Sequence, residues 1–95
     1  MKKAVRKVAD TLRKLNPLFG SADLANAIEE SKLFNGIVYD DGNGSKLVLN
    51  SDNSWTCNIG YARLTFDKDG QLVHIEPKEY VDEVLNLCNI IWFVG

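Results

Sequence analysis

Residues 55–66, Trp-Thr-Cys-Asn-Ile-Gly-Tyr-Ala-Arg-Leu-Thr-Phe, decide the fold of this chain. The apolar side chains at positions 55, 57 and 59 alternate with the polar residues Thr56 and Asn58, and after Gly60 the alternation resumes at positions 62, 64 and 66. A period of two residues is typical of a β-strand with one buried face, and the change of phase indicates a bulge or a short break at Gly60. The stretch therefore predicts extended chain with one face turned to a core.

Further strands are predicted on both sides of this stretch. Residues 37–39 and 46–49 flank Asp40-Asp-Gly-Asn-Gly-Ser45, whose composition is typical of a hairpin turn. On the other side, Asp67-Lys-Asp-Gly70 predicts a tight turn before a last strand, in which we expect Val73 and Ile75 to face inward. Because short turns join neighbouring strands in antiparallel order, this region predicts a three- to four-stranded antiparallel meander.

Amphipathic helices are predicted before the meander. At the helical step of about 100° per residue, the apolar residues of the first fifteen positions share one arc, formed by Ala4, Val5, Val8, Leu12 and Leu15. This helix is expected to end at Asn16, because Pro17 disfavours the α conformation of the residue before it. A second helix is expected from Ser21, a good N-cap residue, to the stop signal Asn35-Gly36, with a buried stripe formed by Leu24, Ala27, Ile28 and Leu33.

A closing helix is predicted from Pro77, which fits the first turn of a helix. Its apolar arc is formed by Tyr80, Val81, Val84, Leu85, Leu87, Cys88 and Ile91. Residues 90–94 are apolar all round, so they either leave the helix as an extended segment or are covered by something else.

Helices grouped at the two ends of a meander are typical of an α+β protein whose helices cover one face of the sheet. The chain has 95 residues, 45% of them hydrophobic, which suits one small core and is too short for two. The sequence therefore predicts a single α+β domain over residues 1–95, in two layers, with two N-terminal helices, the meander and a C-terminal helix.

The formal net charge of −2 hides an uneven distribution. Residues 15–95 carry five basic and twelve acidic groups, a net charge of −7, whereas residues 1–14 carry one acidic group, Asp10, and a net charge of +5. The six basic groups of that first segment are Lys2, Lys3, Arg6, Lys7, Arg13 and Lys14. Such an asymmetry points to a basic segment that meets an anionic surface.

No assembled chemistry is predicted. Cys57 and Cys88 are too few for a disulfide framework and match no zinc spacing, so we expect free, buried thiols. Cys57 and His74, the one histidine, are expected on opposite faces of the sheet, beyond the reach that a nucleophile and its base need. The Asp67 turn departs from a calcium loop at three positions, and the Gly42 turn lacks the spacing of a phosphate-binding loop. We therefore expect no enzyme, with no catalytic, cofactor or metal site.

The basic face of the first helix is the first candidate partner surface. Nucleic acid is a weak match, because the pI is about 5.3 and no aromatic residues interleave with the basic ones. A membrane would favour a more apolar opposite face than two valines and two leucines. An acidic protein surface fits best, and a solvated face without a partner is the alternative. The second candidate surface is the end segment, through Ile90, Trp92 and Phe93, with burial of this segment in the core as its alternative.

These features lead us to expect a small non-enzymatic protein of the adaptor or inhibitor type, which binds another protein by surface docking and forms a homodimer. The start of the chain lacks the apolar region of a secretory signal, and no run reaches the about 18 apolar residues of a membrane span, so the cytoplasm is the expected compartment. Two alternatives stay open: a nucleic-acid-binding protein that uses the basic helix, and a small-ligand-binding module or enzyme whose site is not visible in the sequence.

Overall fold

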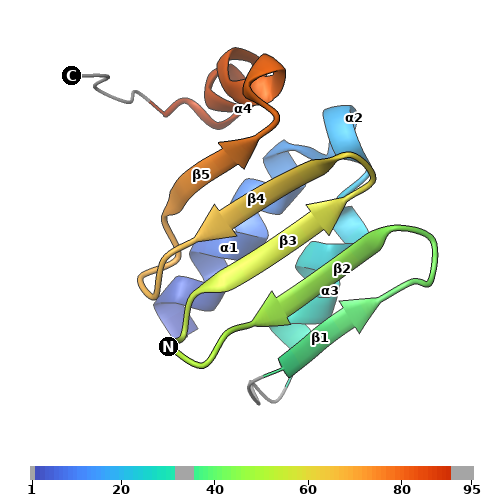
Figure 1. The fold of residues 1–95 in the computed structure, drawn as a ribbon. Helices are drawn as coiled ribbons and strands as arrows, with labels where there is room; N and C mark the ends of the chain where they lie inside the picture. Colours follow the sequence, from blue (N-terminus) through green and yellow to red (C-terminus); the bar gives the residue numbers. More distant parts are fainter. Residues whose placement is uncertain (1, 32–35, 91–95) are drawn as a thin grey trace.

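A computed structural model describes residues 2–31 and 36–90 of the chain. Three helical segments come first, α1 (Lys2–Lys14), α2 (Asn16–Phe19) and α3 (Ala22–Glu30). The strands follow as β1 (Gly36–Asp40), β2 (Ser45–Leu49), β3 (Trp55–Ile59), β4 (Ala62–Phe66) and β5 (Leu72–Glu76). The 3₁₀ helix η1 (Lys78–Tyr80) and the α-helix α4 (Val81–Cys88) complete the order (Figure 1).

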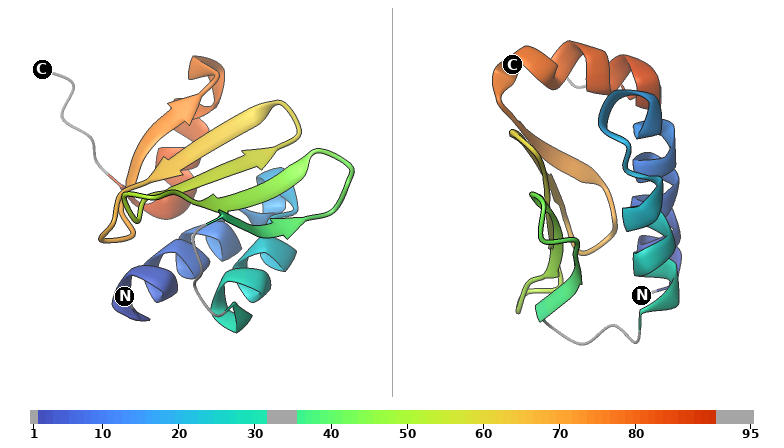
Figure 2. Two further views of the ribbon diagram at one scale, coloured as in Figure 1. Left: turned by 60° about the horizontal axis from the view of Figure 1, so that its bottom comes forward. Right: turned by 90° about the vertical axis from the view of Figure 1, so that its right-hand side faces the viewer.

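The five strands form one antiparallel meander in the order β1-β2-β3-β4-β5. The helices α1 and α3 lie side by side against one face of this sheet, and none of the described helices covers the other face (Figure 2). The predicted α+β architecture in two layers, with its antiparallel meander, is confirmed.

The strand count is higher than the three to four predicted. Gly60 and Tyr61 are not a bulge within one strand but the two-residue loop of a hairpin between β3 and β4, with Ile59 opposite Ala62. Gly60 has a φ of 58°, and glycine at the first loop position is typical of the tight hairpin turns that match strand twist. A two-residue loop exchanges odd for even inward positions, which is the change of phase seen in the sequence.

Of the two inward residues predicted for β5, Val73 was wrong and Ile75 was right. Leu72 is 5% exposed and lies opposite Phe66, whereas Val73 is 50% exposed. The pairing shifts between Thr65 and Phe66, so that Val73 is the additional residue of a bulge. The alternation resumes beyond it, with Ile75 buried and His74 exposed as predicted.

One hydrophobic cluster lies between the sheet and the helices. Trp55 and Phe66 are its largest fully buried side chains. The whole predicted apolar arc of α1 is buried, which confirms the face by which this helix covers the sheet: Ala4, Val5, Val8, Leu12 and Leu15. In α3, Leu24 and Ile28 are buried as predicted, whereas Ala27 is half-buried and Ala25 is buried.

The connection between α1 and α3 contains one more helical turn than predicted. Pro17 lies in the first turn of α2, where its missing N–H costs no helical hydrogen bond. Ser21 occupies the predicted N-cap position of α3, but its hydroxyl makes no cap bond. The buried Ser21 side chain instead donates a hydrogen bond to the carbonyl oxygen of Leu12, which ties the loop to α1.

The helix α3 ends at Glu30, before the stop predicted at Asn35-Gly36. Leu33 and Asn35 lie outside the described residues, as do Ile91, Trp92 and Phe93. In α4, Val84 and Cys88 are buried, whereas Leu87, which was placed on the apolar arc, is 38% exposed. Within residues 2–31 and 36–90, none of the helices has the length and apolar character needed to cross a membrane.

Candidate partner-binding surface

The outer face of α1 carries all six basic residues that were singled out in the sequence. The buried residues of α1 face the sheet, so its basic residues point away from the core, and each of them is exposed: Lys2, Lys3, Arg6, Lys7, Arg13 and Lys14. The structure therefore places these residues on one accessible helix face.

Arg13 differs from the other five because it is paired with α3. Its Nη1 donates to the carboxylate of Glu29, its Nη2 donates to Oδ1 of Asn26 at 3.2 Å, and Asp10 lies 3.9 Å from Nη1. The hydrogen bond from Arg13 lowers the pKa of Glu29, and the same bond raises the pKa of Arg13. The charge of Arg13 is thus largely compensated within the chain, and sequence periodicity could not show this because the pair joins two helices.

Among the described residues, no ion pair involves the other five basic side chains of α1. Lys2 and Lys3 are the first residues of α1 and therefore lie at the positive end of the helix dipole. The first turn contains no acidic residue that would offset their charge. Basic residues at this end are unfavourable for the helix itself. The positive potential of this face is therefore concentrated toward the start of α1.

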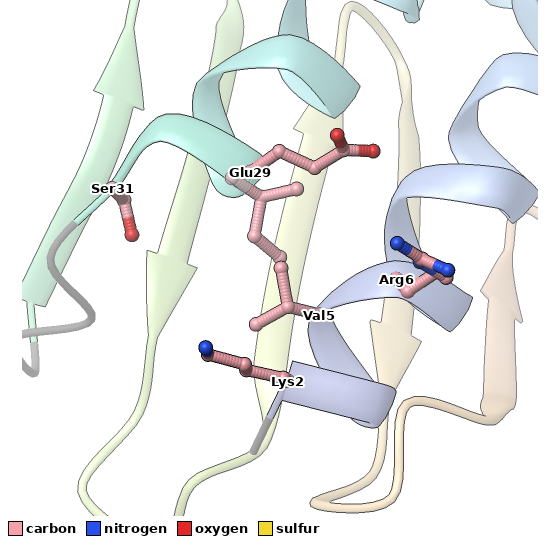
Figure 3. A pocket seen from close by; sticks show the side chains of 6 residues that line it. Lys2, Val5, Arg6, Glu29 and Ser31 are labelled. Carbon is pink, nitrogen blue, oxygen red and sulfur yellow. The ribbon is translucent and has the colours of Figure 1, made fainter.

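A groove runs between α1 and α3, and sequence reasoning did not find it. Its cavity volume is about 290 Å³. It is lined by Lys2, Val5 and Arg6 of α1, by Ile28 and Glu29 of α3, and by Ser31, which follows α3. Figure 3 shows Lys2 and Arg6 projecting from α1 on either side of Val5, with Glu29 on the facing helix. A second hollow of about 240 Å³ shares Lys2 and Arg6 and adds Lys3. The groove thus has two cations and one carboxylate at its rim, with Val5 and Ile28 at its floor.

On the other side of α1, Ile90, the one described residue of the predicted end surface, lies beside basic residues of the helix. A groove of about 510 Å³ is lined there by Lys7 and Lys14, by Gln71 of the β4–β5 turn, and by Asn89 and Ile90. Ile90 is half-buried, packs against the core, and its N–H donates to the carbonyl oxygen of Leu85 at 2.9 Å. Of the predicted end segment, Ile90 therefore contributes partly to the core, while Trp92 and Phe93 lie outside the described residues.

The uncovered face of the sheet has a different charge pattern. One row across it runs from Asp40 through Lys46, Asn58 and Arg63 to Glu76. Nζ of Lys46 lies 3.8 Å from Oδ2 of Asp40. Nε of Arg63 donates to Oδ1 of Asn58 at 3.1 Å. The two basic and two acidic residues of this row cancel in charge, so this row lacks the net positive character of α1.

Cys57 and His74 lie on opposite faces of the sheet, as predicted. Cys57 is fully buried, and burial raises the pKa of its thiol to about 12, so the thiol stays protonated at neutral pH. The exposed His74 instead contacts Glu76, with 2.7 Å between Nε2 and Oε1. This pair cannot act as nucleophile and base in the described geometry.

The two acidic turns use their carboxylates to hold backbone N–H groups. Oδ1 of Asp41 accepts from Asn43 and Ser45, and Oδ1 of Asp67 accepts from Asp69 and Gln71. Both segments are therefore turns, as predicted. Within residues 2–31 and 36–90, no cluster of three or more His, Cys, Asp or Glu side chains could hold a metal ion.

Comparisons of the chain with protein-family models, curated proteins and solved structures found no match.

Proposed function

We propose that the chain is a small non-enzymatic protein-binding module, of the adaptor or inhibitor type, which docks on an acidic protein surface through the outer face of α1. The observation that carries this proposal is the set of five exposed basic side chains on one helix that have no ion pair among the described residues: Lys2, Lys3, Arg6, Lys7 and Lys14. Clustered charge of one sign steers an oppositely charged partner and raises its association rate.

Local stability does not account for the basic residues at the start of α1, although Lys14 in the last turn is favoured by the helix dipole. Lys2 and Lys3 lie at the end of the helix where basic residues are unfavourable, and Lys3 and Lys7 are like charges one turn apart. On the sheet, by contrast, Lys46 lies beside an acidic partner, Asp40. A partner that supplies carboxylates would relieve the repulsion on α1, which supports a docking role over a merely solvated face.

We further propose that the protein forms a homodimer and acts in the cytoplasm. A second copy offers an acidic surface, because residues 15–95 carry a net charge of −7. The free thiols Cys57 and Cys88 suit a reducing compartment. The absence of aromatic side chains from α1 favours a protein over a nucleic acid as the partner, since single strands are held largely by stacking.

A matched pair of triple variants tests the docking proposal. One variant combines Lys3→Glu, Lys7→Glu and Lys14→Glu on α1, and the control combines Lys46→Glu, Arg63→Glu and Lys68→Glu elsewhere, with the same change in charge. Light scattering measures self-association, and affinity purification from the host measures recovery of another protein. We expect the α1 variant to lose the association that the control retains.

A strict monomer that recovers no other protein would contradict the proposal. Equal losses of association in the two variants would show that association depends on the total charge of the chain and not on α1. Recovery of nucleic acid that is released at high salt would favour the nucleic-acid alternative.

A further inference from the structure

We infer that the groove between α1 and α3 receives a stripe on α4 of a second copy of the chain, formed by Glu83 and Leu87. This inference rests on the proposed function, because it names the second copy as a protein whose acidic surface meets α1. In the pairing, Leu87 packs over Val5 and Glu83 meets Lys2 and Arg6.

The stripe on α4 places an apolar and an acidic side chain together. Leu87 is one of the large apolar side chains left exposed, at 38%, and Glu83 precedes it by one helical turn. Residues four apart lie on the same helix face. Glu79 in η1, just before α4, is exposed as well. This part of the surface therefore offers carboxylates beside one exposed leucine.

The groove has the complementary pattern. Val5, which is 8% exposed, and the fully buried Ile28 lie at its floor, and Lys2 and Arg6 provide cations at its rim. Its volume of about 290 Å³ is at the lower limit of small-molecule sites, which suits a few side chains better than a cofactor. The carboxylate of Glu29 is also on the rim, where it forms its ion pair with Arg13 and is attracted more weakly by Arg6. Neither Lys2 nor Arg6 forms an ion pair among the described residues, so both can meet an incoming acid.

Two symmetric pairings of the uncovered sheet face would bring like charges together. A two-fold axis along β3 would place Arg63 over Lys46 and Glu76 over Asp40 of the other copy. An axis along the row would place each charge over its own equivalent. Like charges would oppose each other in both cases, whereas the pairing of the groove with α4 brings opposite charges together. A two-fold dimer would contain this pairing twice.

A charge exchange tests the pairing by sedimentation equilibrium. We expect Arg6→Glu and Glu83→Arg each to weaken the dimer by about tenfold or more, because each opposes like charges at the contact. The double variant Arg6→Glu/Glu83→Arg exchanges the partners and is expected to recover to within about threefold of the unmodified chain. Leu87→Ser is expected to weaken the dimer through loss of the apolar contact. The controls Lys68→Glu and Asp69→Arg carry the same charge changes outside α1 and the groove and are expected to have little effect.

A dimer that is indifferent to Arg6→Glu and Glu83→Arg would overturn the pairing, as would a double variant no stronger than the single ones. A larger ring or filament would overturn the two-fold form. Suppose that the chain stays monomeric to millimolar concentration while α1 is still needed to recover another protein. That result would overturn this inference and leave the proposed function standing. Loss of that recovery as well would remove the proposed function.

Discussion

Arg13 on α1 and Glu29 on α3 form an ion pair that joins the two helices of the outer layer. The pair removes Arg13 from the set of basic side chains open to a partner and leaves five others along the same helix. The outer face of α1 therefore has two kinds of basic residue: one that binds the neighbouring helix, and five that we propose meet another protein.

The pairing of Arg13 predicts how its variants behave. Arg13→Gln and Glu29→Gln are each expected to lower the midpoint of urea unfolding slightly, because the pair is exposed. Either change alone removes the pair, so the double variant should lose less than the sum of the two. Strictly additive losses would show that the two residues act independently. Arg13→Gln should also impair partner binding less than Arg6→Gln does.

Gly70 is predicted to be intolerant of any side chain. A Cβ at this position would lie 2.4 Å from the carbonyl oxygen of Ala4, and the residue has a φ of 83°. Gly70→Ala is expected to reduce the free energy of unfolding by about 2 kcal/mol or more, since it adds a clash to the strain of a positive φ. Gly42→Ala is the matched control, because Gly42 has a φ of 73° with open space around it. Equal losses in urea unfolding would contradict the close approach of the β4–β5 turn to α1.

The bulge in β5 is tested by two neighbouring substitutions. Leu72→Ala is expected to cost about 2–5 kcal/mol of unfolding free energy, since it leaves a cavity in the core. Val73→Thr keeps the β-branched shape at an exposed position and is expected to cost about 0.5 kcal/mol or less. A larger loss of unfolding free energy for Val73→Thr than for Leu72→Ala would contradict the bulge and favour an inward Val73.

The buried thiol of Cys57 predicts a loss of stability at high pH. Its folded pKa is raised to about 12 from an ordinary value of 9.0. Between these values the unfolded thiol loses its proton while the folded one keeps it, so the unfolding free energy falls as pH rises from 9 toward 12. The slope from one such group is about 1.4 kcal/mol per pH unit. Urea unfolding across this range should show a shallower decline for Cys57→Ala, and an unchanged slope would contradict the burial of this thiol.

Carboxylates in two turns predict a loss of stability in acid. Hydrogen bonds from the backbone N–H groups of Asn43 and Ser45 lower the pKa of Asp41 below its ordinary 3.8, and bonds from the hydroxyl and N–H of Ser54 lower that of Asp52. Their contribution is present above pH 3.8 and is lost as pH falls through the folded values. We expect Asp41→Asn/Asp52→Asn to show a smaller drop in urea midpoint between pH 7 and pH 3. A drop of the same size would assign the acid sensitivity to other groups.

Much of the fold could be predicted because the pattern that identifies each of these elements lies within a short stretch of the sequence. The apolar arc of α1, the alternation from Trp55 to Phe66 and the turn at Asp67 are each visible within a few residues. The misplaced features depend on pairing between segments. The bulge at Val73 is defined by the register of β5 on β4. The hydroxyl of Ser21 donates to the carbonyl oxygen of Leu12 on α1 and does not cap α3.

The candidate site was only half predictable for the same reason. Charge and periodicity identified the basic face of α1, but the groove needs Ile28 and Glu29 from α3, which no local pattern connects to Arg6. Nor could the sequence show that Arg13 is paired while Lys2 and Arg6 line a groove.

Zero-length carbodiimide cross-linking tests most directly the claim that α1 is the docking surface, because it joins lysines to the carboxylates they contact. After cross-linking in host extract and mass spectrometry of the products, we predict that links to a second chain start from Lys2, Lys3, Lys7 and Lys14. Links that start only from Lys46, Lys68 and Lys78 would contradict the account.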